Sequence, residues 1–218
     1  MDKIKSSWRK NAGEWIKVLD SNSIGSRKFT NASIVSFISN MIGNRVLDMG
    51  CGEGWLTREL SKSGKKVVGL DATEALLTNA RLKGLESYYH MSYEDVIEGQ
   101  IIPEAPFDLA VFNFSIYQRD NLRQLFKAVK TNLLADGSIV VQTLHPFFLL
   151  QNGYEYKSQF ITDSWKGLPG NFTDGHSWYA RTFEDWFQLI SKSGLELRSF
   201  KEVINDNNQP VSIIFEAG

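Results

Sequence analysis

Short apolar runs alternate with amphipathic segments along most of the chain. The runs at 45–49, 66–70, 87–91, 107–112 and 138–144 have the length and composition of buried strands. Before the last of these runs, one helical face is apolar and the helix is expected to end at Asp136-Gly137. That face carries Leu122, Leu125, Phe126, Val129 and Leu133. Alternating strands and helices predict parallel strands joined by right-handed crossovers.

Both ends of the chain depart from this alternation. Trp8 and Trp15 lie seven residues apart, on one face of a predicted N-terminal helix, and a second helix is expected over 31–42. Near the other end, Thr182 to Asp185 predicts a capped helix start and Gly194 its end. Strands at 195–203 and 211–215 follow, joined by a turn short enough for an antiparallel pair. A dehydrogenase would need a second mononucleotide-binding half there instead.

The chain of 218 residues, 42% of them hydrophobic, is expected to form one domain with a full core. We divide it into an N-terminal helical cap (1–43), a ligand-binding core (44–145), an insertion (146–181), and a closing helix and hairpin (182–218).

Charge and cysteine content narrow the classes of function. The chain has 24 Lys and Arg against 25 Asp and Glu, with no basic block that could follow a phosphate backbone, so nucleic acid is disfavoured as a partner. The single cysteine, Cys51, predicts a reducing compartment, and no Cys/His spacing suits zinc. With no apolar run of about 18 residues, which a membrane span needs, we expect a soluble, cytoplasmic protein. The sequence leaves monomer and homodimer open.

The stretch from Val46 to Gly54 carries the most specific chemical signal. A strand enters a glycine loop spaced G-x-G-x-G, whereas dinucleotide sites use G-x-G-x-x-G. The acids Asp48 and Glu53 flank this loop; they would repel a pyrophosphate but suit a ligand that carries an ammonium and a sulfonium. The next strand ends at Asp71, 21 residues after Gly50, where a carboxylate can bind both ribose hydroxyls.

These motifs resemble those of the class I S-adenosylmethionine-dependent methyltransferases. The match covers residues 43 to 145: the Val46 to Gly54 loop, Asp71, the Phe107 to Asn113 strand and the Gly137 to Thr143 strand. The local pattern is similar to stand-alone bacterial members that act on small molecules. The resemblance implies a Rossmann-like α/β fold with seven strands, in which the last strand inserts antiparallel between the fifth and sixth. It also implies S-adenosylmethionine as cofactor and S-adenosylhomocysteine as product.

The resemblance assigns cofactor contacts position by position. Asp48, Gly50, Cys51 and Gly52 would lie at the methionine end together with Asn113, and Asp71 would bind the ribose. Ala72, Ser92 and Tyr93 would lie near the adenine, although the acid usual at the last two positions is absent here. Other roles stay open: Asp48 could cap the glycine turn, Asp71 could cap the next helix, and Cys51 suits a tight loop by being small.

Outside those motifs, five side chains are candidates on their own chemistry. Arg27 could bind the carboxylate of the cofactor or be a surface cation, and Trp15 could close over the cofactor or pack in the core. His145, after the fifth strand, is the first candidate for a general base, followed by Tyr117 and His176. His145 could equally be a hydrogen-bonded structural residue.

The insertion is unusually aromatic. Nine of the 35 residues from Phe147 to Arg181 are aromatic, against 12% in the whole chain. Such a loop either covers a satellite core or, as long loops at a ligand-binding edge often do, forms a substrate lid.

Together these features predict direct in-line methyl transfer to a nucleophilic atom of a small, partly apolar molecule, with no metal. A non-catalytic S-adenosylmethionine-binding domain stays open as an alternative. A nicotinamide-dependent oxidoreductase is opposed by the glycine spacing, and an RNA-modifying enzyme by the charge balance. The Asn113-Phe114-Ser115-Ile116 segment also lacks the two prolines of enzymes that methylate base amino groups.

Overall fold

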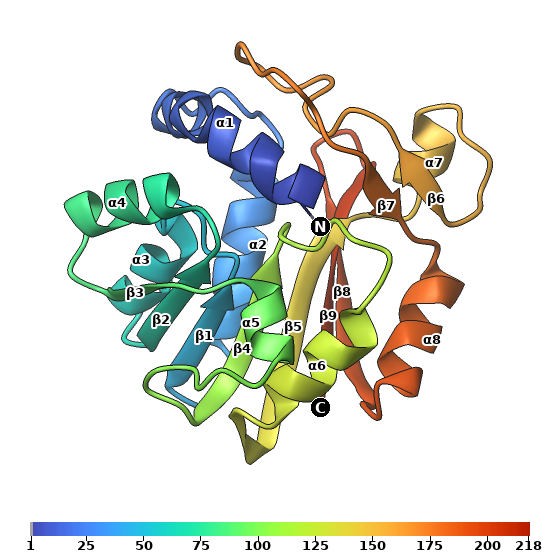
Figure 1. The fold of residues 1–218 in the computed structure, drawn as a ribbon. Helices are drawn as coiled ribbons and strands as arrows, with labels where there is room; N and C mark the ends of the chain where they lie inside the picture. Colours follow the sequence, from blue (N-terminus) through green and yellow to red (C-terminus); the bar gives the residue numbers. More distant parts are fainter. Residues whose placement is uncertain (1) are drawn as a thin grey trace.

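The computed structural model describes residues 2–218, which form a seven-stranded sheet between two layers of helices (Figure 1). The strand order is β3-β2-β1-β4-β5-β9-β8. The strands are β1 (Arg45–Met49), β2 (Lys66–Asp71), β3 (Ser87–His90), β4 (Phe107–Asn113), β5 (Leu133–Leu144), β8 (Leu197–Ile204) and β9 (Pro210–Ala217). β1 to β5 pair in parallel, and β9 pairs antiparallel with both β5 and β8. The expected seven-stranded α/β sheet, with its last strand inserted antiparallel, is confirmed.

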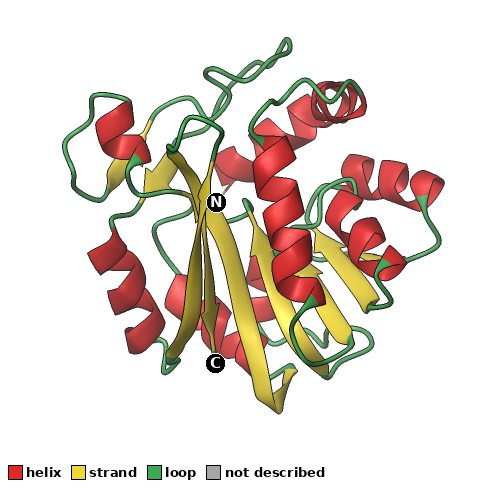
Figure 2. Ribbon diagram, turned by 180° about the vertical axis from the view of Figure 1, so that it is seen from behind, coloured by secondary structure: helices red, strands yellow, loops and turns green. Residues whose placement is uncertain are grey.

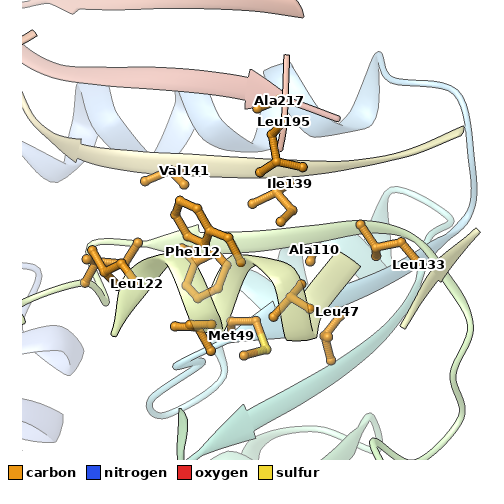
Figure 3. Packing of buried hydrophobic residues seen from close by; sticks show 14 of the residues in the cluster. Leu47, Met49, Ala110, Phe112, Leu122, Leu133, Ile139, Val141, Leu195 and Ala217 are labelled. Carbon is orange, nitrogen blue, oxygen red and sulfur yellow. The ribbon is translucent and has the colours of Figure 1, made fainter. Parts of the chain in front are cut away.

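One face of the sheet is covered by α5 (Tyr93–Ile97), α6 (Leu122–Lys130) and α8 (Phe183–Lys192), which lie in front of it in Figure 1. Alternate residues of the central strands, such as Leu47, Met49, Ala110 and Phe112, point into this layer and are fully buried (Figure 3). Burial of this apolar area supplies the main driving force for the sheet to form.

The opposite face packs against α2 (Arg27–Ser39) and α3 (Trp55–Lys62), seen in front of the sheet in Figure 2. The strand side chains that point to this face, including Val46 and Val111, pack against Ile34 and Ile38 of α2 and Leu56 of α3. α4 (Glu74–Lys83) forms a small cluster of its own with Cys51 and Tyr88. Because both faces are covered, the carboxyl edge of the parallel strands is left for a ligand.

Two predicted helix boundaries are wrong. α6 ends at Lys130, and Leu133 begins β5, where it pairs with Phe107 before the register shifts at Leu109. A strand can use an apolar side chain that also fits a helical stripe, so periodicity alone extended the helix too far. α2 begins at Arg27 and ends at Ser39, and Ile42, predicted inside it, is fully exposed.

Two segments lie over the carboxyl edge of the sheet, at the top of Figure 1. One is the N-terminal helix α1 (Asp2–Asp20). The other is the insertion, which contains α7 (Phe148–Gln151) and a two-stranded sheet of β6 (Gln159–Ile161) and β7 (Trp178–Ala180).

Candidate functional site

The glycine loop after β1 has backbone conformations that require glycine. Gly50, Gly52 and Gly54 all have positive φ, at 74°, 59° and 77°. At Gly50 a Cβ atom would lie 2.6 Å from Cβ of Ser115 and 2.7 Å from Oη of Tyr93, whereas a Cβ at Gly52 would meet nothing within 4 Å. The backbone at Gly52 therefore faces open space beside the ends of the central strands.

Asp71 connects the end of β2 to this loop. Its Oδ2 accepts a hydrogen bond from the N–H of Gly52 at 2.9 Å, and its Oδ1 accepts from the N–H of Thr73 at 2.7 Å. Burial raises the pKa of this carboxyl above its usual value, while the two N–H groups act in the opposite direction. Each carboxylate oxygen can still accept another hydrogen bond, as two adjacent hydroxyls would require.

Asp48 is a buried acid on β1, with 1% of its surface exposed. Its Oδ2 accepts a hydrogen bond from Oγ1 of Thr57 at 2.7 Å. Burial, opposed by that bond and reinforced by the charges of Asp71 and Glu53, raises the pKa of Asp48 to about 7. A cation bound nearby would favour its ionised form. No sequence pattern predicts this role of Thr57, because a threonine inside a helix has no distinguishing spacing or neighbours.

Glu53, the second acid of the loop, is neutralised by the protein itself. It is 2% exposed and forms an ion pair with Arg58 at 2.6 Å, and Lys83 lies 3.8 Å away. The single buried acid of the loop that has no ion-pair partner among residues 2–218 is thus Asp48.

Among the other predicted cofactor residues, one has an unpartnered polar atom and the rest have hydrogen-bond partners within the protein. Oδ1 of Asn113, at the end of β4, is buried and has no hydrogen-bond partner in the described chain. Ser92 caps α5 through a reciprocal bond pair with Asp95, so its side chain already has partners. Oη of Tyr93 donates toward the carbonyl oxygens of Met49 and Ser115, close to the glycine loop. The backbone oxygen of Ala72 lies 3.1 Å from Nε2 of His90.

Arg27 is the first residue of α2 and not, as predicted, a residue that precedes it. Its guanidinium lies over the ring of Trp55, 4.7 Å from the centroid, next to the glycine loop. Within residues 2–218 the side chain of Arg27 makes no hydrogen bond or ion pair, although its backbone N–H donates to the carbonyl oxygen of Ile24, and burial lowers the pKa of the guanidinium. A partly buried cation with free donors is suited to a carboxylate ligand.

An aromatic cluster, which we call the roof, covers the same edge. It joins α1, the loop after β4 and the insertion through successive ring contacts between 4.6 and 6.3 Å. Its members are Trp8, Trp15, Tyr117, Trp165, Phe172 and His176. The predicted Trp8 and Trp15 stripe is thus present, with ring centroids 5.3 Å apart, and both rings face the insertion.

Polar side chains of α1 hold the insertion in place. Asn11 donates to the carbonyl oxygen of Thr173 at 2.7 Å and accepts from its N–H at 2.9 Å. Ser7 accepts from Nε1 of Trp165 at 2.9 Å, and Glu14 accepts from the N–H of Asn171 at 2.8 Å. No sequence pattern indicates these contacts, because the partners are about 160 residues apart. α1 and the insertion form one cover.

Tyr117 links this cover to the cofactor edge. It lies four residues beyond Asn113, and its ring contacts both Trp8 and His176 at 5.9 and 5.0 Å. Burial raises the pKa of Tyr117 well above its ordinary value, with a smaller contribution from the negative charge of Asp71. Its carbonyl oxygen accepts from the N–H of Tyr179, and Arg181 donates to the next two carbonyl oxygens, so the insertion also fixes the loop that carries Tyr117.

The two candidate histidines have different surroundings. His145 is buried, its Nδ1 accepts from the N–H of Phe147 at 3.2 Å, and its Nε2 lies 2.8 Å from Oε1 of Glu202. Both ring nitrogens of His145 therefore have partners within the protein. His176 is also buried, but its Nε2 has no partner in the described chain, and burial lowers its pKa to about 4.

Residues 2–218 lack two other features. No group of three or more His, Cys, Asp or Glu side chains among them could hold a metal ion. None of the helices in that range has the length and hydropathy to span a bilayer.

Comparisons with known proteins place the chain in a family. The "Methyltransferase domain" family matches residues 10–199. An uncharacterised protein from Haemophilus influenzae is 28% identical over 123 residues, covering 52% of this chain and 47% of that protein. A ubiquinone biosynthesis O-methyltransferase from Nitrosococcus oceani is 33% identical over 95 residues, covering 44% of this chain and 38% of that protein. The chain spans less than half the length of these relatives.

Solved structures agree on the fold. An S-adenosylmethionine-dependent methyltransferase from Mesorhizobium loti superposes with a TM-score of 0.63 at 20% identity, over 85% of this chain and 95% of that one. A 1,6-didemethyltoxoflavin-N1-methyltransferase from Burkholderia thailandensis gives 0.61 at 16% identity, over 93% of this chain and 88% of that one. With a family match over most of its length and this shared fold, the chain belongs to the methyltransferase-domain family.

Proposed function

We propose that the protein transfers a methyl group from S-adenosylmethionine to a nucleophilic atom of a small, partly apolar molecule. The observation that carries this proposal is the position of Tyr117, whose ring joins the aromatic roof and whose loop directly follows Asn113 at the cofactor edge. A cofactor edge closed by uncharged rings suits a small organic acceptor.

The side chains at the carboxyl edge fit this cofactor. Asp71 has capacity left for two ribose hydroxyls, and the open backbone at Gly52 leaves room beside it. Asp48 and the unpartnered Oδ1 of Asn113 suit an ammonium group, and Arg27 suits the carboxylate. Ala72, directly after Asp71, is assigned to the adenine side, whereas the hydroxyl of Tyr93 lies beside the glycine loop. Of the cofactor residues that the resemblance implied, Ser92 is given no contact because its hydroxyl serves its helix cap, and neither Gly50 nor the side chain of Cys51 is given one.

When bound, the cofactor supplies an electrophilic methyl group on a sulfonium. The protein must then align the nucleophile and exclude water, and orientation of this kind can contribute about 7–11 kcal/mol. The roof excludes water because its rings and the bonds from Ser7, Asn11 and Glu14 close α1 onto the insertion. We assign Trp15 to this cover rather than to a direct cofactor contact.

His176 and Tyr117 are better suited than His145 to supply the polar group that contacts the methyl acceptor. Both nitrogens of His145 have partners, whereas His176 offers a buried nitrogen without one. With a pKa of about 4, His176 is neutral at pH 7 and is a hydrogen-bond acceptor more than a strong base.

The names of two similar proteins are compatible with this proposal. One is a ubiquinone biosynthesis O-methyltransferase and the other a 1,6-didemethyltoxoflavin-N1-methyltransferase, so one name specifies transfer to oxygen and the other to nitrogen. The acceptor atom of the present chain is therefore left to experiment.

The decisive experiment measures release of labelled methyl groups from S-adenosylmethionine, separately with a panel of small metabolites and with total RNA. Transfer to a metabolite that is lost in Asp71→Ala supports the proposal. Transfer to RNA alone, or cofactor binding without transfer to either pool, contradicts it; the second result would indicate a non-catalytic binding domain.

A further inference from the structure

The imidazole of His176 is the most unusual polar group in the roof. The residue is 3% exposed, its ring lies nearly perpendicular to the rings of Tyr117 at 5.0 Å and Trp165 at 5.9 Å, and Nε2 has no hydrogen-bond partner within residues 2–218. Leaving a buried polar atom unpaired costs about 1–3 kcal/mol. A ligand bound beside Tyr117 can provide the missing partner.

The other ring nitrogen already has a partner, which limits the hydrogen bonds that Nε2 can make. Nδ1 lies 3.0 Å from Oγ of Ser164, and the backbone N–H of Ser164 is bound to the carbonyl oxygen of His176 at 2.9 Å, so the two residues are fixed together. The tautomer with its proton on Nδ1 donates to Ser164 and leaves the Nε2 lone pair as an acceptor, whereas the other tautomer accepts from Ser164 and leaves the Nε2 N–H as a donor. A hydroxyl group can serve either tautomer, and it donates to the first.

The surroundings of His176 limit the charge that such a ligand can carry. The six rings of the roof carry no formal charge, because burial keeps His176 neutral. Asp163, whose negative charge acts on His176, is exposed. An anionic ligand would lose hydration without gaining a counter-ion. A cationic ligand would face the positive charge of the sulfonium, and an ammonium nitrogen also lacks the lone pair that a methyl acceptor needs.

The roof also favours a flat ligand. Trp165 and Phe172 stack with centroids 4.6 Å apart and planes 10° apart, while Trp8 meets Trp165 nearly at right angles. Rings prefer these stacked and edge-to-face arrangements, and an aromatic ligand could adopt both.

We propose that the methyl acceptor is an uncharged aromatic molecule with a hydroxyl group that donates a hydrogen bond to Nε2 of His176. The hydrogen bond directs the hydroxyl group, while the rings of the roof hold its aromatic plane. This inference rests on the proposed function, of which it names the substrate class.

The test compares two ligands that differ in this donor. 2-Naphthol has the hydroxyl, and 2-methoxynaphthalene has the same rings without it. Their dissociation constants are measured by equilibrium dialysis against protein saturated with S-adenosylhomocysteine at pH 7. We expect naphthol to bind about tenfold more tightly, equivalent to about 1.4 kcal/mol, and to shift the ring signals of His176 in the NMR spectrum.

Variants separate this hydrogen bond from general packing. His176→Phe keeps a flat ring without the nitrogen and should bind both ligands equally. His176→Gln carries an amide oxygen at similar reach and should restore part of the preference for naphthol. Ser164→Ala should reduce this preference, because Nδ1 loses its partner and either ring nitrogen can then carry the proton. Phe160→Leu changes a half-exposed ring of the insertion outside the roof and should leave the preference unchanged. Circular dichroism confirms that each variant is folded.

Three results would overturn the inference: equal binding of the two ligands by the wild type, an unchanged preference in His176→Phe, or tighter binding of 2-naphthoate or of 2-naphthylmethylammonium. The proposed function fails separately. Absence of S-adenosylhomocysteine binding contradicts it, whereas cofactor binding without a naphthol preference contradicts only the acceptor class.

Discussion

The carboxylate of Asp71 accepts a hydrogen bond from the backbone N–H of Gly52 at 2.9 Å, which ties the end of β2 to the glycine loop of β1. The second oxygen, through Thr73, ties the same carboxylate to the start of α4. One side chain therefore both shapes the loop and faces the ligand edge.

Asp71→Asn should lower affinity for S-adenosylhomocysteine by at least about tenfold, or about 1.4 kcal/mol. The amide has a single acceptor oxygen, so its NH₂ must face the N–H of either Gly52 or Thr73. Titration calorimetry measures the change. Asp163→Asn, at an exposed site in the insertion, is the matched control. Equal affinity of Asp71→Asn and the wild type would refute the role of this carboxylate.

The pKa of Asp48, about 7, makes cofactor affinity depend on pH. Binding of an ammonium group beside Asp48 favours the ionised carboxylate, so the complex binds fewer protons than the free protein. Affinity for S-adenosylhomocysteine should therefore rise from pH 5.5 to about 7.5 and then level off. Calorimetry in buffers of different ionisation enthalpy should show proton release on binding at pH 6.5.

Asp48→Asn should reduce both this pH dependence and the proton release. The same raised pKa also acts on folding: the folded protein holds the Asp48 proton more tightly than the unfolded chain, so this contribution to stability is present at low pH and is lost as pH rises through about 7. A pH dependence that survives unchanged in Asp48→Asn would assign it to another group.

Arg27 should discriminate between two ligands that differ in the amino-acid portion. Arg27→Met should weaken S-adenosylhomocysteine by about tenfold, since a charge-assisted hydrogen bond contributes about 1.5–3 kcal/mol. Binding of 5′-methylthioadenosine, which has no carboxylate, should stay the same. Lys28→Met, at the adjacent exposed position, is the control for charge alone. A parallel loss for both ligands would show that Arg27 acts through the fold.

The alternation of strands and helices, the glycine loop and the antiparallel pair at the end followed from the sequence because each is encoded locally, whereas the insertion of the last strand between the fifth and sixth was implied by the family resemblance. Val46 to Gly54 joins an apolar strand to a turn that only glycines adopt, and Thr182 caps α8 as its spacing predicts. The roof did not follow, because Asn11 and Thr173 meet through tertiary packing that no periodicity records. The sequence alone does not distinguish the roles of His145 and His176, because these depend on the hydrogen-bond partners that each ring has in the folded protein.

His145 should prove structural. His145→Ala removes a buried ring that bridges Phe147 and Glu202, and should lower the free energy of unfolding by about 2–4 kcal/mol through lost packing and hydrogen bonds. Chemical denaturation measures this, while affinity for S-adenosylhomocysteine should be preserved in the folded fraction. Glu202→Gln keeps an acceptor and should cost less. If His145→Ala keeps its stability but loses methyl transfer, the histidine acts on the acceptor after all.

The contact between Asn11 and Thr173 should control how α1 and the insertion open. Asn11→Ala removes both hydrogen bonds of the pair, each contributing about 0.5–1.5 kcal/mol, while Trp8 and Trp165 stay in place. Hydrogen exchange at the backbone of residues 171–176 should accelerate, and that of β4 and β5 should not, because the core does not depend on the cover. Lys10→Ala removes an exposed ion pair to the adjacent Asp174 and should have a smaller effect, since such pairs contribute about 0–1 kcal/mol. Acceleration spread evenly over the sheet would mean that α1 stabilises the whole fold rather than acting as a cover.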